Sequence, residues 1–348
     1  MRKLLVALVS LSVVIVLGVL FFAPPFSAQE LDLNRLHVPA GFHVELFAKV
    51  PKARLMTFSP GGTLLVTSTS DGAVYALPDP QHSGKAERLA TVAQDLNAPH
   101  GIAFYQGKLY VADTDEVLRF DWDEANLKAS NPQSVVQLSR GGMHFTRTLL
   151  FNNGKMYVAS GSDCNVCEEK DPHRAAVTEY TPDGKELRIF ASGLRNDVGL
   201  SVNPITHTIW GGDNGRDWLG DNLPPEEIND LDGGGKNFGW PYCYGNKLPN
   251  PEFKAQGEKI CPTTVAPKVE IQAHSAPLGV TFYTGTMFPA EYKNGLFVAL
   301  HGSWNRSALS GYKVDFIPFG ANGEPSGPAR DFLTGFVRPG EPKNGPRM

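Results

Sequence analysis

The sequence has few cysteines, no cluster of one charge and little sign of helix. Its 348 residues include four cysteines and carry a formal net charge of −4, from 32 basic and 36 acidic side chains. Such a mildly acidic, unclustered balance argues against nucleic acid as a partner. No segment after residue 28 repeats apolar residues with a sustained helical period, which argues against an all-α fold. The motif at 164–167 is Cys-x-x-Cys followed by Glu168, whereas c-type haem attachment needs histidine at that position.

The first 28 residues have the pattern of a targeting segment. Arg2 and Lys3 precede an apolar run over 4–23, and Ser27-Ala28 offers a cleavage point. The run approaches the roughly 20 residues that cross a bilayer, and Phe26 stands where signal peptidase prefers a small residue. A cleaved signal peptide and a retained membrane anchor both remain open. Either one predicts an exported, periplasmic domain over 29–348.

The four cysteines therefore belong to an oxidising compartment, where disulfides are expected. The simplest pairing is local, Cys164 with Cys167 and Cys243 with Cys261, although four cysteines allow three connectivities. A zinc site is disfavoured because Cys243 and Cys261 are too far apart to resemble a second ligand pair. A structural disulfide after Asp163 is the favoured interpretation of the Cys-x-x-Cys motif.

One strand–turn–strand pattern recurs along the chain. Glycine (36) and proline (27) mark the turns. The five copies cover residues 56–67, 100–113, 147–160, 198–213 and 278–301. The first copies are spaced by roughly 45 residues, the length of a four-stranded propeller blade. We therefore predict an all-β fold, a six-bladed β-propeller; small β-sandwich domains are the structural alternative.

The sixth blade is predicted to be incomplete. Five blades fit between 41 and 318, and a sixth would begin at 329–336, but the residues after 336 have few alternating apolar positions. We expect a gap between the first and fifth blades, filled only by a strand near 331–337 and by residues 30–40.

A hairpin over 147–160 brings together two residues suited to acid–base chemistry. Alternating strands flank Asn153-Gly154, a strong two-residue hairpin signal. The hairpin should return Asp163 to the neighbourhood of His144. A carboxylate beside an imidazole fixes its tautomer and raises its basicity, so His144 is a candidate general base.

This hairpin resembles the His-x-x-Gly-Arg-type segment and following Gly-Asp of the soluble quinoprotein glucose and sorbosone dehydrogenases. Those proteins carry pyrroloquinoline quinone (PQQ) on a six-bladed β-propeller. The resemblance implies that His144 takes the substrate hydroxyl proton and that Asp163 supports it. The family's Gly-Arg pair is replaced here by Arg147-Thr148.

Further segments extend the resemblance over about residues 40–336. Arg195-Asn196 resembles a Gly-x-Arg-Asn segment, which implies that Arg195 contacts the quinone carbonyls and that Asn196 lies beside the cofactor. The blocks at 213–217, 225–229 and 235–241 resemble the segments that hold a calcium ion through backbone carbonyls, here those of Gly215 and Arg216.

Loops on one face of a propeller converge on its axis, so polar loops of successive blades form one site. The resemblance places Arg306 against the cofactor carboxylates. Trp304 either stacks on the quinone or packs in the core, and His100 is either near the quinone or an ordinary loop histidine.

The expected protein is a PQQ- and calcium-dependent dehydrogenase of a sugar or sugar aldehyde that passes electrons to a cytochrome or ubiquinone. Two alternatives remain: a calcium-dependent lactonase-like propeller, which needs several acidic or amide side chains on the axis, and a non-catalytic propeller that binds no quinone.

Overall fold

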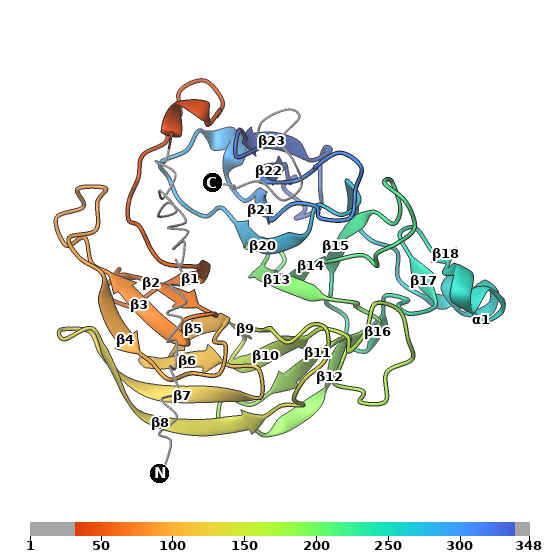
Figure 1. The fold of residues 1–348 in the computed structure, drawn as a ribbon, viewed down its shortest axis with the longest axis horizontal. Helices are drawn as coiled ribbons and strands as arrows, with labels where there is room; N and C mark the ends of the chain where they lie inside the picture. The colour runs from red at the N-terminus through yellow and green to blue at the C-terminus, as the bar shows by residue number, and fades with distance from the viewer. Residues whose placement is uncertain (1–31, 338–348) are drawn as a thin grey trace, which may run out of the picture.

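Five sheets, each built on four antiparallel strands and one extended by a fifth strand, stand around a common axis in the computed structural model, which describes residues 32–337 (Figure 1). The predicted all-β propeller is therefore confirmed. The predicted targeting segment, residues 1–28, lies outside the described residues. No helix within residues 32–337 is long and apolar enough to cross a membrane.

Each sheet follows its strands in chain order, from the axis outward. The first sheet contains β1 (Ala53–Phe58), β2 (Leu64–Ser68), β3 (Ala73–Leu77) and β4 (Ala90–Ala93). The second contains β5 (Gly101–Tyr105), β6 (Lys108–Ala112), β7 (Glu116–Asp123) and β8 (Lys128–Gln137). The third contains β9 (Arg147–Asn152), β10 (Lys155–Ser160), β11 (Ala176–Tyr180) and β12 (Glu186–Ser192), with β16 (Lys236–Asn237) added in parallel.

The last two sheets complete the described ring. The fourth contains β13 (Asp197–Val202), β14 (Ile209–Asp213), β15 (Glu226–Asp230) and β19 (Val269–Ile271). The fifth contains β20 (Pro277–Phe282), β21 (Leu296–Leu300), β22 (Lys313–Ile317) and β23 (Arg330–Leu333). Each of the five strand–turn–strand copies predicted from the sequence forms the first two strands of one sheet.

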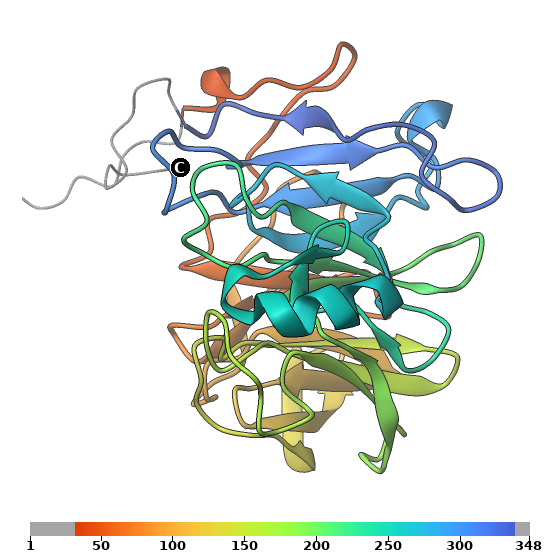
Figure 2. The same ribbon diagram turned by 90° about the vertical axis from the view of Figure 1, so that its right-hand side faces the viewer.

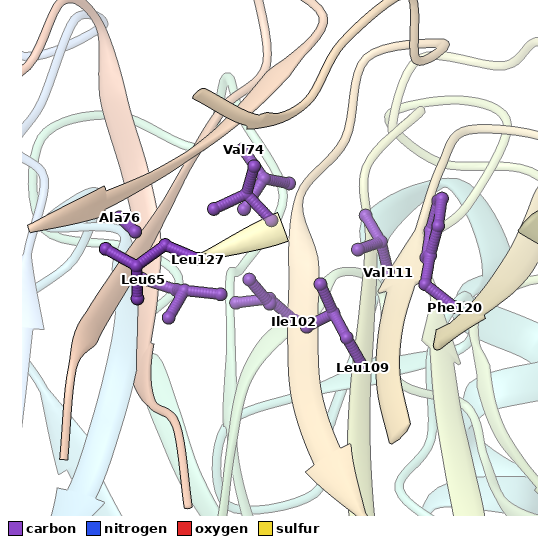
Figure 3. Close-up of a cluster of buried hydrophobic side chains, with 9 residues drawn as sticks. Leu65, Val74, Ala76, Ile102, Leu109, Val111, Phe120 and Leu127 are labelled. Carbon is purple, nitrogen blue, oxygen red and sulfur yellow. The ribbon is translucent and has the colours of Figure 1, made fainter. Parts of the chain in front are cut away.

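The core lies between neighbouring sheets because each sheet buries its apolar faces against the next. Between the first two sheets, Leu65 and Val74 meet Leu109 and Val111, and all four are fully buried (Figure 3). Similar clusters join the second sheet to the third, the third to the fourth and the fourth to the fifth. These contacts fix the angle at which each inner strand approaches the axis.

The insertion between β14 and β20 carries most of the remaining elements. They are β17 (Cys243–Tyr244), β18 (Leu248–Pro249), and the short helices η2 (Pro251–Phe253), α1 (Lys254–Ile260) and η3 (Cys261–Thr263). Helix α1 lies at the outer rim of the propeller (Figures 1 and 2). Its seven residues are too few to show a sustained helical period in the sequence. Two further short helices are η1 (Leu33–Arg35) and η4 (Ala290–Tyr292).

The first and fifth sheets do not close the ring against each other. Within residues 32–337, no sheet stands between them; a groove of about 430 Å³ lies there, lined by β1, β20 and β21. The gap that the sequence predicted is therefore present. The assignment of 329–336 to a sixth blade is wrong, because β23 pairs with β22 as the outer strand of the fifth sheet.

The segment before β1 bridges this opening. His37 pairs with Thr334, and the Phe42 ring packs edge-on against Phe288 and Phe332 of the fifth sheet. Residues 43–52 then run to β1 without forming a strand. His37, from the residues expected to fill part of the gap, thus pairs at the end of the fifth sheet, and the chain then crosses the opening to β1.

Candidate functional site

His144 lies just before β9, and the hairpin that positions it forms as predicted. Asn153 and Gly154 have φ of 48° and 74°, the left-handed conformations of a type I′ turn. β9 and β10 pair from Lys155 opposite Asn152 to Ser160 opposite Arg147. The loop that carries the imidazole is tied to the end of β10, because His144 N donates to Ser162 O at 3.2 Å.

The protonation of His144 is set by Ser162. The imidazole Nδ1 lies 2.9 Å from Ser162 O and 2.9 Å from Ser162 Oγ. The Ser162 hydroxyl donates to Cys164 O at 2.7 Å, so both oxygens near Nδ1 act as acceptors. Nδ1 therefore carries the proton and Nε2 keeps its lone pair. Burial, followed by the nearby Arg195 charge, lowers the pKa of His144 to about 3.

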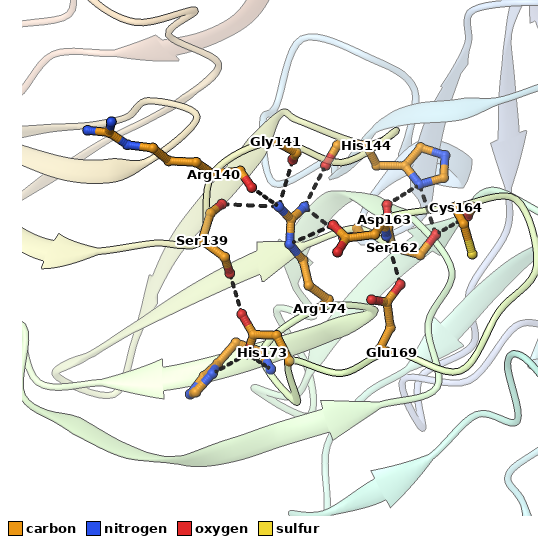
Figure 4. A network of polar contacts seen from close by, with 12 residues as sticks. Ser139, Arg140, Gly141, His144, Ser162, Asp163, Cys164, Glu169, His173 and Arg174 are labelled. Atoms are coloured by element: carbon orange, nitrogen blue, oxygen red, sulfur yellow. Dashed lines mark hydrogen bonds and ion pairs between the residues drawn. The ribbon is translucent and has the colours of Figure 1, made fainter.

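Asp163 does not support His144 in the way expected. The two segments are adjacent, because Met143 N donates to Asp163 O at 2.9 Å, but the carboxylate turns away from the imidazole. Its Oδ1 pairs with Arg174 Nε at 3.2 Å (Figure 4). The expectation that Asp163 orients the base is therefore corrected: Ser162 holds the imidazole, and Asp163 is drawn to a buried arginine that comes eleven residues later.

Two buried arginines shape the loop around His144. Arg174 donates to the carbonyl oxygens of Ser139, Gly141 and His144 at 3.1, 2.6 and 3.2 Å. Arg147 donates to Ser139 O and His144 O, both at 2.9 Å. Burial, and then repulsion from Arg174, lowers the pKa of Arg147 to about 10. The departure at Arg147-Thr148 thus has a structural role: Arg147 anchors the backbone of the base.

Arg195, just before β13, is held by oxygens on all five of its N–H groups. Nε donates to Asn165 O at 3.1 Å, and Nη2 donates to Asn165 Oδ1 at 2.9 Å and to Asp217 Oδ2 at 3.1 Å. Nη1 donates to the carbonyls of Asn214 and Gly215 at 3.2 and 2.8 Å. The guanidinium is therefore fixed, and it acts on its surroundings through its charge.

The Cys164–Cys167 loop carries the residue that fixes Arg195. Both predicted disulfides are present, Cys164–Cys167 and Cys243–Cys261. Asn165 lies inside the first one and also accepts from Asp217 N at 2.8 Å through Oδ1. The disulfide loop therefore touches both sides of the site, since Cys164 O holds Ser162 and Asn165 holds Arg195.

His144 and Arg195 face one cavity of about 300 Å³ at the axis. Its other polar lining comes from Asn196, Asn214, Asp217, Glu226, His274 and Asn305. Of these, Asn214 and Asp217 lie in the connection between β14 and β15, and Glu226 begins β15. Trp304 also lines it, as expected. Asn305 lines the cavity, and its Oδ1 atom is buried and without a hydrogen-bond partner in the described residues.

Buried carboxyl groups gather at and behind the wall of this cavity. Asp197, Asp213 and Glu227 stand opposite one another on β13, β14 and β15, and Glu226 is adjacent. Burial raises the pKa of Asp213 to about 6, of Glu226 to about 7 and of Glu227 to about 8. Backbone N–H groups counter part of this rise in pKa, because they stabilise the charged carboxylate. Glu226, for example, accepts from Gly215 N and Ala276 N at 2.6 and 3.1 Å.

Three predicted ligand residues lie elsewhere. His100 lines the groove between β1 and β20, with Nδ1 3.2 Å from Arg147 O. Arg306 is buried and donates to Ala273 O at 3.3 Å, so its charge is used within the fold. The Arg216 side chain is buried against Asn250 and Glu252. The Gly215 carbonyl, a predicted calcium ligand, accepts from Arg195 instead.

Comparison with known proteins decides the family. The TrAA12-like family model matches residues 36–336. The chain belongs to the TrAA12-like family. This TrAA12-like protein is 33% identical over 337 residues to an uncharacterised protein of Borreliella burgdorferi, covering 92% of this chain and 86% of that protein.

Two further relatives have described activities or structures. A PQQ-dependent pyranose dehydrogenase of Coprinopsis cinerea is 27% identical over 345 residues, which cover 83% of this chain but 46% of that protein, so the chain spans about half of its length. The calcium structure of the Trichoderma reesei carbohydrate-active enzyme of family AA12 superposes with a TM-score of 0.75 at 24% identity, covering 86% of this chain and 87% of that one. That likeness shows the shared fold.

Sequence reasoning missed several residues of this TrAA12-like site. The His144 imidazole is held by Ser162, and Arg195 is held by Asn165 and Asp217. Asn305 bonds to Asp217 in the cavity wall. Ser162 and Asn165 lie on either side of Cys164, the first cysteine of the Cys-x-x-Cys motif, whose pattern indicates only a disulfide. Their only sequence signal is that position, between the predicted base and the predicted disulfide.

Proposed function

We propose that this protein is a PQQ-dependent dehydrogenase that oxidises a hydroxyl group of a sugar or sugar aldehyde. The observation that carries the proposal is the His144 imidazole, which is uncharged, has its proton on Nδ1 and turns toward the axial cavity. A base in this state can accept a substrate proton without first losing its own. The family and the Coprinopsis relative support the cofactor and the substrate class.

The residues of the cavity fit PQQ. The cavity, of about 300 Å³, combines a fixed positive charge, the amides of Asn196 and Asn305, and the Trp304 ring. PQQ carries three carboxylates, which the Arg195 charge can attract, although the ion pair with Asp217 offsets part of that charge. When bound, the quinone supplies the acceptor for the substrate hydride.

The chain's own residues handle the proton and the charge. His144 Nε2 takes the proton of the reacting hydroxyl, while Nδ1–H stays on Ser162. The imidazolium that forms is close to Arg195, so it returns its proton readily, as its lowered pKa indicates. Arg195 favours negative charge that develops in the cavity, and its five bonds to protein oxygens keep that charge in place before the reaction.

The described residues do not fit calcium at the predicted position. The Asn214 and Gly215 carbonyls accept from Arg195, so a guanidinium occupies the place where the ion would be held. Among the side chains of residues 32–337, His, Cys, Asp and Glu approach closely enough for a metal only at Cys164, Cys167 and Glu169, where the two sulfurs form a disulfide. We assign no step to calcium.

The remaining parts of the proposal follow from the sequence. An N-terminal export signal or anchor places the domain outside the cytoplasm, in the periplasm. A cytochrome or ubiquinone takes the electrons from the reduced cofactor, since the Cys-x-x-Cys motif carries no haem.

The test is reconstitution of the purified protein with PQQ, with and without calcium, followed by absorbance spectra. A shifted quinone spectrum on binding and its reduction by an aldose or aldehyde are expected. A panel of aldoses and aldehydes with an artificial electron acceptor then ranks the substrates. Failure of the protein to bind PQQ in either condition, or binding without reduction by any sugar, overturns the proposal.

A further inference from the structure

Two tryptophans stand exposed at the mouth of the axial cavity. Trp218 is 67% exposed and Trp304 is 59% exposed, although most large apolar side chains of the described residues are buried. Their ring centroids lie 5.1 Å apart at an interplanar angle of 85°. Because Trp304 also lines the cavity, the pair extends the cavity wall outward into solvent.

The backbone of Trp218 is held in an unusual conformation. Its φ is +72°, in the left-handed region that bulky residues rarely adopt. Strain of this kind persists where the surrounding structure imposes it, and it concentrates at binding and catalytic sites. An exposed tryptophan gains nothing for folding from this position, so the strain indicates a use for the exposed ring.

The loops that carry the two rings are fastened to each other. Asn305 Nδ2 donates to Asp217 Oδ1 at 2.9 Å, and Ser307 N donates to Asp221 Oδ1 at 2.9 Å. The Ser307 hydroxyl also bonds to Asp221. His274 Nε2 lies 2.8 Å from Gly220 O, which ties the Trp218 loop to the start of β20. The rings are therefore positioned before a ligand arrives, which lowers the entropy lost on binding.

Resting on the proposed function, we propose that Trp218 and Trp304 form a second sugar subsite. It takes the pyranose ring next to the one that reacts at His144, so the substrate is an oligosaccharide or a glycosylated sugar. The C–H face of a pyranose packs on an indole ring, while its hydroxyls need polar partners at the ring edge. Asp217 follows Arg216 next to Trp218 in the sequence and lines the cavity, so its carboxylate can accept from sugar hydroxyls.

The two rings stand perpendicular to each other and continue the cavity wall, and this favours a ligand that packs on one ring face and enters the cavity. A protein partner would need a much wider apolar surface than two side chains. Protein docking is therefore an outcome that the test must separate from sugar binding.

The test measures sugar binding in protein without PQQ, so it does not depend on oxidation. The probes are methyl β-cellobioside and methyl β-glucoside, which carry no free anomeric hydroxyl, and calorimetry gives their affinities. Trp218→Ala and Trp304→Ala should each weaken methyl β-cellobioside binding by roughly tenfold and methyl β-glucoside binding by less than about threefold, as expected from losing one aromatic contact. Trp218→Phe should recover most of the disaccharide affinity.

Met287→Ala is the matched control, because Met287 is 89% exposed and lies in the connection beyond the far end of β20. It should leave both affinities unchanged. The proposal is overturned if the unmodified protein binds methyl β-cellobioside no more tightly than methyl β-glucoside, or if both alanine variants keep the disaccharide affinity. It is also overturned if the variants change the oligomeric state in solution while sugar binding stays the same.

Discussion

His144 combines two properties that an isolated imidazole lacks. Burial and the Arg195 charge keep it neutral well below its usual pKa, and Ser162 decides which nitrogen is free. His144→Ala should therefore lower turnover by on the order of 10²–10⁴ while PQQ still binds. Stopped-flow reduction of the reconstituted protein measures the first effect and the quinone spectrum measures the second. Full activity in this variant would remove His144 from the reaction.

Substitutions of Asp163 and Ser162 should affect turnover to different degrees, because only Ser162 contacts the imidazole of His144. Asp163→Asn should change turnover by less than about threefold, because the carboxylate pairs with Arg174 and does not touch the imidazole. Ser162→Ala should change turnover more, because it removes one of the two Nδ1 acceptors and the link to Cys164. The pH profile of turnover for both variants is the measurement. A larger loss in Asp163→Asn than in Ser162→Ala would restore the carboxylate as the partner of the base.

The sequence identified the reactive side chains better than their partners. His144, Arg195, Asn196 and Trp304 lie on the cavity as expected, because loops that open successive blades must converge. Asp163 was misassigned since its strongest partner, Arg174, is buried by contacts with several distant carbonyls, and no local pattern reveals such a cluster. The prediction that Arg306 binds the cofactor was wrong for a similar reason. Its side chain is buried, and its N–H groups donate to protein carbonyls.

At the scale of elements, removal of one disulfide should mainly affect activity, and removal of the other should mainly affect stability. In the chain-entropy view, closing the short Cys164–Cys167 loop stabilises by about 2 kcal/mol and closing the longer Cys243–Cys261 loop by about 3 kcal/mol. Only the first disulfide holds Asn165 against Arg195. Replacing Cys164 and Cys167 with Ser should therefore reduce activity more, and replacing Cys243 and Cys261 should lower the Tm more.

The two double variants serve as controls for each other, with Tm from calorimetry and turnover from the reconstituted protein. The mild reduction of unmodified protein adds a second check, because Cys243 and Cys261 are 3% and 1% exposed while the other pair is more accessible. If the Cys164/Cys167 variant keeps full turnover, the disulfide loop has no part in positioning Arg195.

Elements with strong local signals were predictable, and those fixed by long-range pairing were not. Asn153-Gly154 defined its hairpin because the turn type needs two left-handed residues. The partner of β23 was missed because four residues with ordinary strand composition can pair with β22 or begin a new sheet. Tertiary context decides between these choices.

At the scale of the whole molecule, the interrupted ring makes the sheets unequal. The third and fourth sheets are packed on both sides, whereas the first and fifth face the groove on one side. We expect backbone amides of β1 and β20 to exchange with solvent faster than those of β9 and β13, because local opening costs less where fewer apolar contacts are lost. Hydrogen-exchange mass spectrometry compares the four strands directly. Uniform protection would show that the groove does not weaken its borders.

The buried carboxyl groups predict how stability changes with pH. The pKa values of Asp213, Glu226 and Glu227 are raised in the folded protein, so the stability that their protonated forms contribute is complete below pH 4 and is lost as pH rises through 6 to 8. His144 acts in the other direction: its lowered pKa makes its contribution complete above pH 6.5 and lost as pH falls toward 3.

The Tm should therefore fall between pH 6 and pH 9. Glu226→Gln should make that fall shallower, and His144→Ala should leave it unchanged over this range. Calorimetric scans at several pH values measure the effect. A Tm that rises from pH 6 to pH 9 would contradict the assignment of raised pKa values to these carboxyl groups.

The ring formed by the described sheets is interrupted between the fifth and the first. A blade of an unbroken propeller packs against two neighbours, whereas the fifth sheet packs against the fourth on one side and faces the groove on the other. Leu278 of β20 lines both the groove and the axial cavity, so the two spaces share a wall. A shift of the fifth sheet would move that wall, so we expect a change at the groove to alter the width of the axial cavity as well.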